Sequence, residues 1–261
     1  NEKIYPIDTK ILDNMITLSK EHHKWKLLEK RCKLMLTLNS QGSPIYIPKK
    51  LDVYKNYISM SLFQQNKFVE LFRYIKNNNF SKGDYWLARI NLQISPNIGL
   101  KYFLSHVPYE TSLLLICLLT CAKINNPLLA KKFKSELSFK SLTEKEQLIL
   151  DAANSVLSKN RLAAINKIFN SLAQLTDDER KLYKLELLIF QIYFENNQIQ
   201  NAHEILIDYE KHTRNDPACR LAISILADRN QDYQKVIYQL EQAFTHELIN
   251  VPEDIKSMYK F

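Results

Sequence analysis

The chain has 261 residues and a net charge of +8, and its 46% apolar content is enough for a continuous hydrophobic core. It contains only 3 Gly. Because Gly supplies positive φ at low cost, this composition argues against a glycine-rich phosphate loop and against folds with many tight turns. The most apolar run, Leu113–Cys121, is much shorter than the roughly 20 residues that cross a bilayer, so we expect no membrane span.

Helical spacing of apolar residues runs through the whole chain, as in Ile11, Leu12, Met15 and Ile16, and no segment alternates as a strand does. We expect helices over about residues 8–21, 25–39, 51–65, 67–76, 84–93, 97–106, 110–122, 128–137, 141–158, 161–175, 180–195, 197–212, 218–229 and 233–247. The strongest start is Thr176–Glu179, a capping residue followed by acids. These roughly fourteen helices predict an all-α fold of about seven antiparallel hairpins.

The longest interruption is the segment of residues 40–50, which holds one Gly and two Pro and therefore predicts an insertion loop. We expect the rest of residues 1–261 to form one helical-repeat domain. The chain starts without Met, and Pro252 near its end looks like the start of another helix. We therefore expect a fragment of a longer protein.

A repeat becomes visible when the second helix of each hairpin is aligned by its first residue. These anchors are Trp25, Phe68, Asn97 (or Ile98), Pro127 (or Leu128), Leu162, Ile199 and Tyr233. Three residues after the anchors stand Leu28, Leu71, Leu100, Ala130, Ile165, Ala202 and Val236, which are all apolar. Most spacings are 30 to 37 residues, and a regular period of this length is typical of a solenoid.

The pattern resembles the tetratricopeptide repeat (TPR), whose second helix alternates bulky residues with Ala. The matching positions are Asn197, Ile199, Ala202, Leu206 and Tyr209 in one repeat and Asp232, Tyr233, Val236, Leu240, Ala243 and Phe244 in another. Asn or Gln replaces the Gly of the family, and its terminal Pro is mostly missing. The resemblance implies a right-handed TPR-like superhelix (α-solenoid) with a concave groove lined by the first helices.

Two surfaces are candidates for binding a partner. By the resemblance, the groove would be lined by Asn56, Met60, Phe63, Tyr85, Arg89, Gln191 and Phe194. A basic face would be formed by Lys20, Lys24, Lys26, Lys30 and Lys33. This face could attract an acidic protein or peptide; it could equally be a solvated lysine-rich surface. We expect no direct nucleic-acid binding, because Trp25 occupies a core anchor rather than a position where it could stack on bases.

Motifs for chemistry are missing. The sequence has no nucleophile elbow, phosphate loop or HExxH motif. His22 and His23 lack a nearby third metal ligand, and the four cysteines, Cys32, Cys117, Cys121 and Cys219, form no CxxC pair. We therefore expect no catalytic residue, cofactor or metal, with reduced core thiols of a cytoplasmic protein (or a nuclear one, if eukaryotic).

The sequence thus predicts a non-enzymatic interaction scaffold that binds a partner segment, or a copy of itself as a homodimer, within a multiprotein assembly. The alternative is a regulatory or sensor TPR domain of a bacterial transcription activator whose DNA-binding domain lies outside this fragment. A third possibility, a chaperone for secreted proteins, fits less well because such chaperones have about three repeats.

Overall fold

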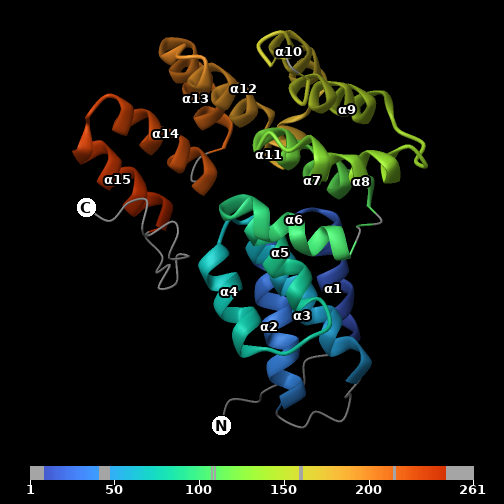
Figure 1. The fold of residues 1–261 in the computed structure, drawn as a ribbon. Coiled ribbons are helices and arrows are strands. Elements are labelled where there is room, and N and C mark those ends of the chain that lie inside the picture. The colour runs from blue at the N-terminus through green and yellow to red at the C-terminus, as the bar shows by residue number, and fades with distance from the viewer. Residues whose placement is uncertain are drawn as a thin grey trace. The chain divides into compact units, whose positions relative to one another are not determined.

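The computed structural model describes residues 9–40, 48–106, 108, 110–158, 161–213 and 216–244. Within these ranges the regular structure consists of fifteen α-helices, and no strand occurs (Figure 1). The all-α prediction is confirmed for this part of the chain. The chain divides into two compact units, residues 1–90 and 91–261, with the division inside α5 (Gly83–Ile94). Each unit is described by itself.

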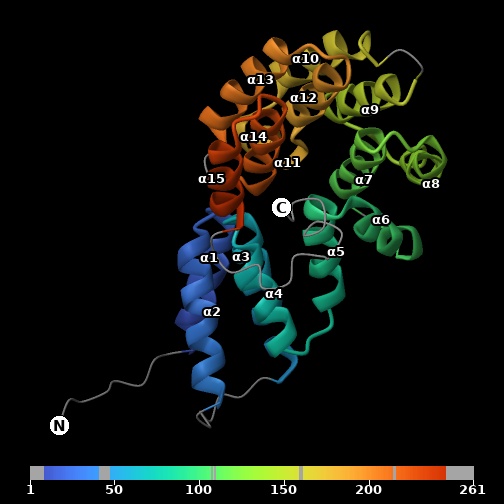
Figure 2. The same ribbon diagram turned by 60° about the vertical axis from the view of Figure 1, so that its left-hand side comes forward.

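The first unit is built from α1 (Thr9–Glu21), α2 (Trp25–Ser40), α3 (Pro48–Gln64), α4 (Phe68–Asn77) and the start of α5. Within this unit α1 packs on α2, α2 on α3 and α3 on α4, and α1, α2 and α3 lie side by side in Figure 2. Their shared core includes Ile16, Leu28 and Ile58, which are almost completely buried. The predicted insertion at residues 40–50 falls largely on residues 41–47, which lie outside the described ranges.

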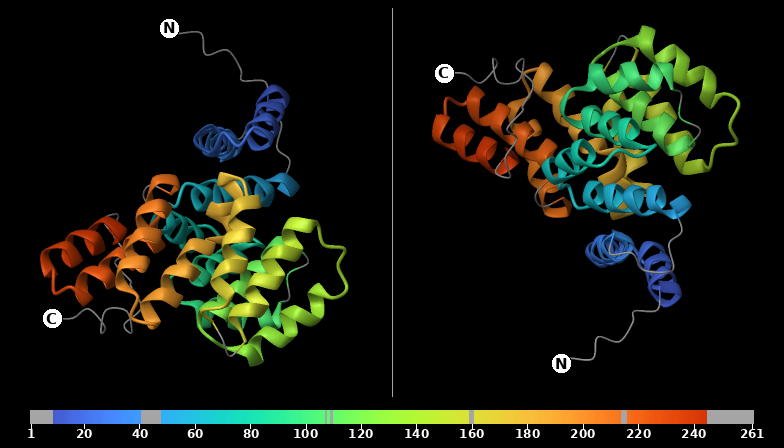
Figure 3. Two further views of the ribbon diagram at one scale, coloured as in Figure 1. Left: turned by 90° about the horizontal axis from the view of Figure 1, so that it is seen from above. Right: turned by 90° about the horizontal axis from the view of Figure 1, so that it is seen from below.

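The second unit continues with antiparallel helix pairs. Its helices are the end of α5, α6 (Pro96–Ser105), α7 (Thr111–Lys123), α8 (Pro127–Leu137), α9 (Glu144–Val156), α10 (Ala164–Gln174), α11 (Asp177–Tyr183), α12 (Leu185–Glu195), α13 (Ile199–His212), α14 (Pro217–Arg229) and α15 (Tyr233–Phe244). The closest contacts are within the pairs α7/α8, α9/α10, α12/α13 and α14/α15. Neighbouring pairs also touch, since α7 packs on α9 and α13 on α14. Figure 3 shows the orange and red helices, α12 to α15, in adjacent rows.

The same tight turn joins the two helices of five pairs. In each turn one residue has a left-handed backbone: His23, Asn66, Asn125, Asn197 and Gln231, with φ between 51° and 59°. The next residue donates its N–H to a carbonyl five positions back, as from Asn126 to Cys121 at 2.9 Å. These features define the Schellman motif, which satisfies the last carbonyls of a helix. A short local signal therefore fixes where each second helix begins.

The repeat register is supported by burial. Five anchors, Trp25, Phe68, Pro127, Ile199 and Tyr233, are the first residues of their helices, each two positions after the left-handed residue. The seven apolar residues three positions after the anchors are all buried, with exposed fractions of 0 to 6%. The anchors themselves are mostly not buried: Tyr233 is 54% exposed and Leu128 74%. The core contact of each second helix therefore comes from the position one turn into the helix.

One predicted helix is divided in two. The prediction placed a single helix over residues 180–195, whereas α11 ends at Tyr183 and α12 begins at Leu185. Between them Lys184 has a left-handed backbone with φ of 51°. The predicted start at Thr176 is confirmed, because its hydroxyl and Glu179 form a reciprocal capping box. The break explains why fifteen helices occur in the described residues instead of fourteen.

The predicted core thiols are confirmed as buried: all four cysteines are buried and unbridged. Burial raises the pKa of Cys32, Cys121 and Cys219 to about 12, so these thiols stay protonated and unreactive at neutral pH. Among the described residues, no helix is both long and apolar enough to cross a membrane.

Candidate functional site

Four of the predicted groove residues meet around Trp86 in the first unit. The Trp86 indole N–H donates to Asn56 Oδ1 at 2.8 Å, and the rings of Phe63 and Trp86 lie 5.6 Å apart. The guanidinium of Arg89 lies 4.8 Å from the Phe63 centroid and donates to the Tyr85 hydroxyl at 3.0 Å. These contacts join α3 to α5. Met60 is partly exposed.

The other two predicted groove residues belong to the second unit. The Gln191 amide donates to the carbonyl of Lys123 at 2.8 Å and to Glu195 Oε1 at 2.9 Å. The Phe194 ring packs on Phe190 with centroids 5.7 Å apart. Gln191 therefore ties α12 to the carboxyl end of α7. For all seven groove residues, the partner-binding role stays a prediction.

The lysines of the predicted basic face are all exposed. Lys26, Lys30 and Lys33 follow each other at spacings of four and three residues and so share one face of α2. Lys33 pairs with Glu29 at 2.6 Å, and the Lys20 ammonium lies 5.0 Å from the Tyr57 ring centroid. No carboxylate among the described residues lies within ion-pair distance of Lys26 or Lys30.

The same face of α2 also exposes two leucines that sequence reasoning missed as surface residues. Leu27 is 46% exposed and Leu34 is 39% exposed, whereas Leu28, the residue after Leu27, is completely buried. Residues 26, 27, 30, 33 and 34 lie opposite the buried stripe of Leu28, Cys32 and Met35. The signal was present in the sequence as two leucines displaced from that stripe. We call these five residues the α2 face.

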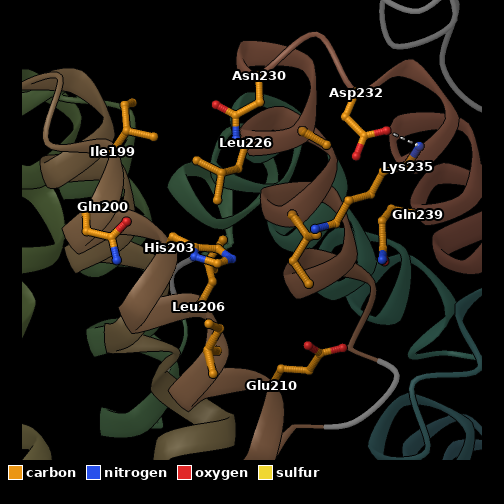
Figure 4. Close-up of a pocket in the computed structure, with 13 residues that line it drawn as sticks. Ile199, Gln200, His203, Leu206, Glu210, Leu226, Asn230, Asp232, Lys235 and Gln239 are labelled. Carbon is orange, nitrogen blue, oxygen red and sulfur yellow. Dashed lines mark hydrogen bonds between the residues drawn. The ribbon is translucent and has the colours of Figure 1, made fainter.

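A groove of about 210 Å³ lies between α13 and α15 in the second unit (Figure 4). Its floor is apolar, with Leu206 from α13 and Leu226 and Ala227 from α14. Polar groups line its rim: Gln200, His203, Glu210, Asn230, Asp232, Lys235 and Gln239. Such a groove can accept an apolar side chain on its floor and hydrogen-bond the backbone that carries it. Its rim charges are mixed, so it favours no sign of charge.

Buried charges join α12, α13 and α14. Asp216 is 3% exposed and accepts hydrogen bonds from the Tyr209 hydroxyl at 2.6 Å and from the backbone N–H of Ala218 at 3.0 Å, while Lys184 Nζ lies 2.9 Å from it. Burial alone would raise the pKa of Asp216, but Lys184 and the hydrogen bonds outweigh burial and hold the pKa below its usual range.

A second buried carboxylate lies close by. Glu186 is completely buried and pairs with Arg180 at 2.6 Å, and Arg180 also reaches Asp208 at 3.2 Å. One oxygen of Glu186 has no hydrogen-bond partner among the described residues. These pairs hold the α11–α12 junction in place. Sequence reasoning missed both buried carboxylates, because their partners are 6 to 32 positions away.

Groups of three or more His, Cys, Asp or Glu residues able to hold a metal ion do not occur within the described ranges. Comparison with known proteins adds no identification: no family model, no curated protein and no solved structure matches this chain at a significant level. Functional assignment therefore depends on the surfaces described above.

Proposed function

We propose that this chain is a non-enzymatic, TPR-like superhelical scaffold that binds an acidic segment of a partner protein in a larger assembly. The proposal is carried by the α2 face, where exposed leucines lie among exposed lysines. Exposed leucines in helical register with lysines form an amphipathic surface, which suits a partner helix or strand with acidic residues around an apolar centre.

Electrostatics and burial favour a protein partner over a nucleic acid. The net charge of +8 attracts anionic partners in general. A bound phosphate backbone, however, would offer the exposed leucines no apolar surface. A protein segment with apolar residues can cover Leu27 and Leu34 and remove them from water. Trp25 is only partly exposed, with its ring 5.2 Å from that of His23, so it does not offer an open face for base stacking.

The test compares two double charge reversals. Lys26→Glu with Lys30→Glu changes the α2 face, while Lys131→Glu with Lys167→Glu changes the same charge at exposed positions of α8 and α10. Proteins captured by the wild type from cells of its source are identified, and the direct affinity of each is measured with the purified partner. We expect the first variant to bind an acidic partner at least about tenfold more weakly, with a reduced salt dependence, and the control to bind normally.

A third variant, Leu27→Ser with Leu34→Ser, separates the apolar contribution from the charge. It keeps the lysines. We expect it to bind the same partner more weakly, with an unchanged salt dependence of the affinity. If Lys26 and Lys30 were needed only for binding RNA or DNA, the scaffold proposal would be wrong and nucleic-acid binding would replace it. Concentration-dependent dimerisation that the α2-face variants abolish would instead identify a second copy of the chain as the partner.

A further inference from the structure

A second cavity, of about 60 Å³, lies at the carboxyl end of α7 in the second unit. It is bounded by α7, by the α11–α12 junction, by the first turn of α14 and by Leu92 and Gln93 at the end of α5. Most of its lining is apolar, including Leu119 from α7 and Leu187 from α12. Two lysines, Lys123 and Lys184, also line it.

The two amines differ in their partners. Lys184 is paired with Asp216, whose oxygens also accept from Tyr209 and from the N–H of Ala218. Lys123 is only partly exposed, and among the described residues its amine takes part in no hydrogen bond or ion pair. Burial lowers the pKa of Lys123, the charge of Lys184 lowers it further, and Asp216 offsets only part of this. The cavity is thus lined by two lysines, of which only Lys184 is paired with a carboxylate.

We infer that this cavity binds a small aliphatic carboxylic acid whose carboxylate pairs with Lys123. One negative charge would pair with Lys123, and a carboxylate carries one negative charge. The volume exceeds the roughly 10–15 Å³ that one water requires, so a carboxylate group fits. The apolar walls suit a short hydrocarbon chain.

Phosphate fits less well, because its several oxygens need several donors. The Thr120 hydroxyl in the lining already donates to the carbonyl of Ile116 at 2.7 Å, and Lys184 is already paired. This site shares no residue with the α2 face. A ligand site of this kind is what a sensor domain requires, so its occupancy would favour the regulatory alternative for this protein without depending on the scaffold function.

The test is a calorimetric titration of the whole chain with acetate, propionate, butyrate and inorganic phosphate. Butyramide is the neutral control for butyrate. We expect binding to strengthen by about fourfold for each added methylene, and both butyramide and phosphate to bind at least about tenfold more weakly than butyrate. Lys123→Met should lower the affinity for butyrate by at least about tenfold. Lys131→Met, at an exposed position of α8, should leave this affinity unchanged.

Proton uptake gives a second readout that loss of folding cannot imitate. A bound carboxylate favours the charged amine, so butyrate should raise the pKa of Lys123 and draw in up to one proton at pH values above its lowered pKa. Titrations in two buffers with different ionisation enthalpies measure this uptake. The other titratable or charged groups are Lys184 and Tyr183 in the lining and Asp216, which pairs with Lys184. All three remain in Lys123→Met, which should show no uptake.

Three outcomes would overturn the inference: equal binding of butyrate and butyramide, stronger binding of phosphate than of butyrate, or unchanged butyrate affinity in Lys123→Met. Absence of butyrate binding at about 100 mM would do so too. Circular dichroism and the thermal midpoint of Lys123→Met establish that the variant is folded.

Discussion

The turn at Gln231 and the junction at Lys184 both contain a residue with a left-handed backbone, with φ of 59° and 51°, but they are stabilised in different ways. At Gln231 the stabilising contacts are backbone hydrogen bonds to Asp228 and, from Asp232, to Ala227, at 2.9 and 3.0 Å. At Lys184 the side chain reaches 32 positions along the chain to a buried carboxylate, Asp216. The first feature is local and repeated, whereas the second depends on tertiary structure.

This difference separates architecture from candidate function. Turns of the Gln231 type recur in five helix pairs and set the spacing of the repeat. The Lys184 junction interrupts a helix and lines a cavity together with Lys123. Strained backbone positions persist where surrounding contacts determine them, and such positions often mark functional sites. The irregular junction is therefore the better place to look for a ligand.

The largest expected effect comes from removing Asp216. Asp216→Ala leaves the ammonium of Lys184 without its partner, removes the acceptor of the buried Tyr209 hydroxyl and deletes the cap of α14. Breaking a buried pair on one side costs roughly 3–5 kcal/mol. We expect the free energy of unfolding, measured with urea, to fall by about that amount. A loss below about 1 kcal/mol would mean that the junction is not held by this pair.

The pH dependence of the same variant identifies the charge as the cause. The pKa of Asp216 is lower in the folded protein than its usual value. Its stabilising effect is therefore complete above the unfolded-state pKa of about 3.9 and is lost as pH falls through the lower folded-state pKa. The difference in stability between wild type and Asp216→Ala should be constant from pH 6 to 7 and shrink below about pH 4.

Replacement by Gly is expected to have smaller effects, which differ in sign between Gln231 and Lys184. Gly adopts this backbone without the cost of roughly 1–2 kcal/mol that other residues incur. Gln231→Gly should therefore stabilise the protein. Lys184→Gly gains the same relief but breaks the pair with Asp216, so we expect a net loss of about 2–3 kcal/mol. Urea unfolding of both variants measures the signs, and equal signs would show that the two sites are held alike.

The helices and their register were predictable because their causes are local. Three local features act within one or two helical turns. They are the turn residue two positions before an anchor, the apolar residue three positions after it, and the acids that follow Thr176. The alternation of core and surface was less predictable at the anchors. Tyr233 looks like a core residue by sequence type, yet it is 54% exposed because Val236 takes the core position.

The candidate sites were less predictable because they depend on distant partners. Nothing near Lys184 in the sequence indicates that its amine meets Asp216, and without that pair a regular helix was the expected structure for residues 180–195. Lys123 reads as an ordinary basic residue at the end of α7, where cations are favourable. Only the positions of Lys184 and Leu187 show that Lys123 lines a cavity. By contrast, the exposed lysines of α2 were found from charge alone.

The smallest effect concerns the repeated turns themselves. Asn tolerates the left-handed backbone better than Gln, because its short side chain can hydrogen-bond locally. We therefore expect Gln231→Gly to raise the free energy of unfolding by about 1 kcal/mol and Asn125→Gly by only a few tenths, since Gly also increases the entropy of the unfolded chain. Thermal and urea unfolding of the two variants, together with the double variant, test this order. A larger gain at Asn125 would show that packing, and not backbone preference, decides which residue each turn carries.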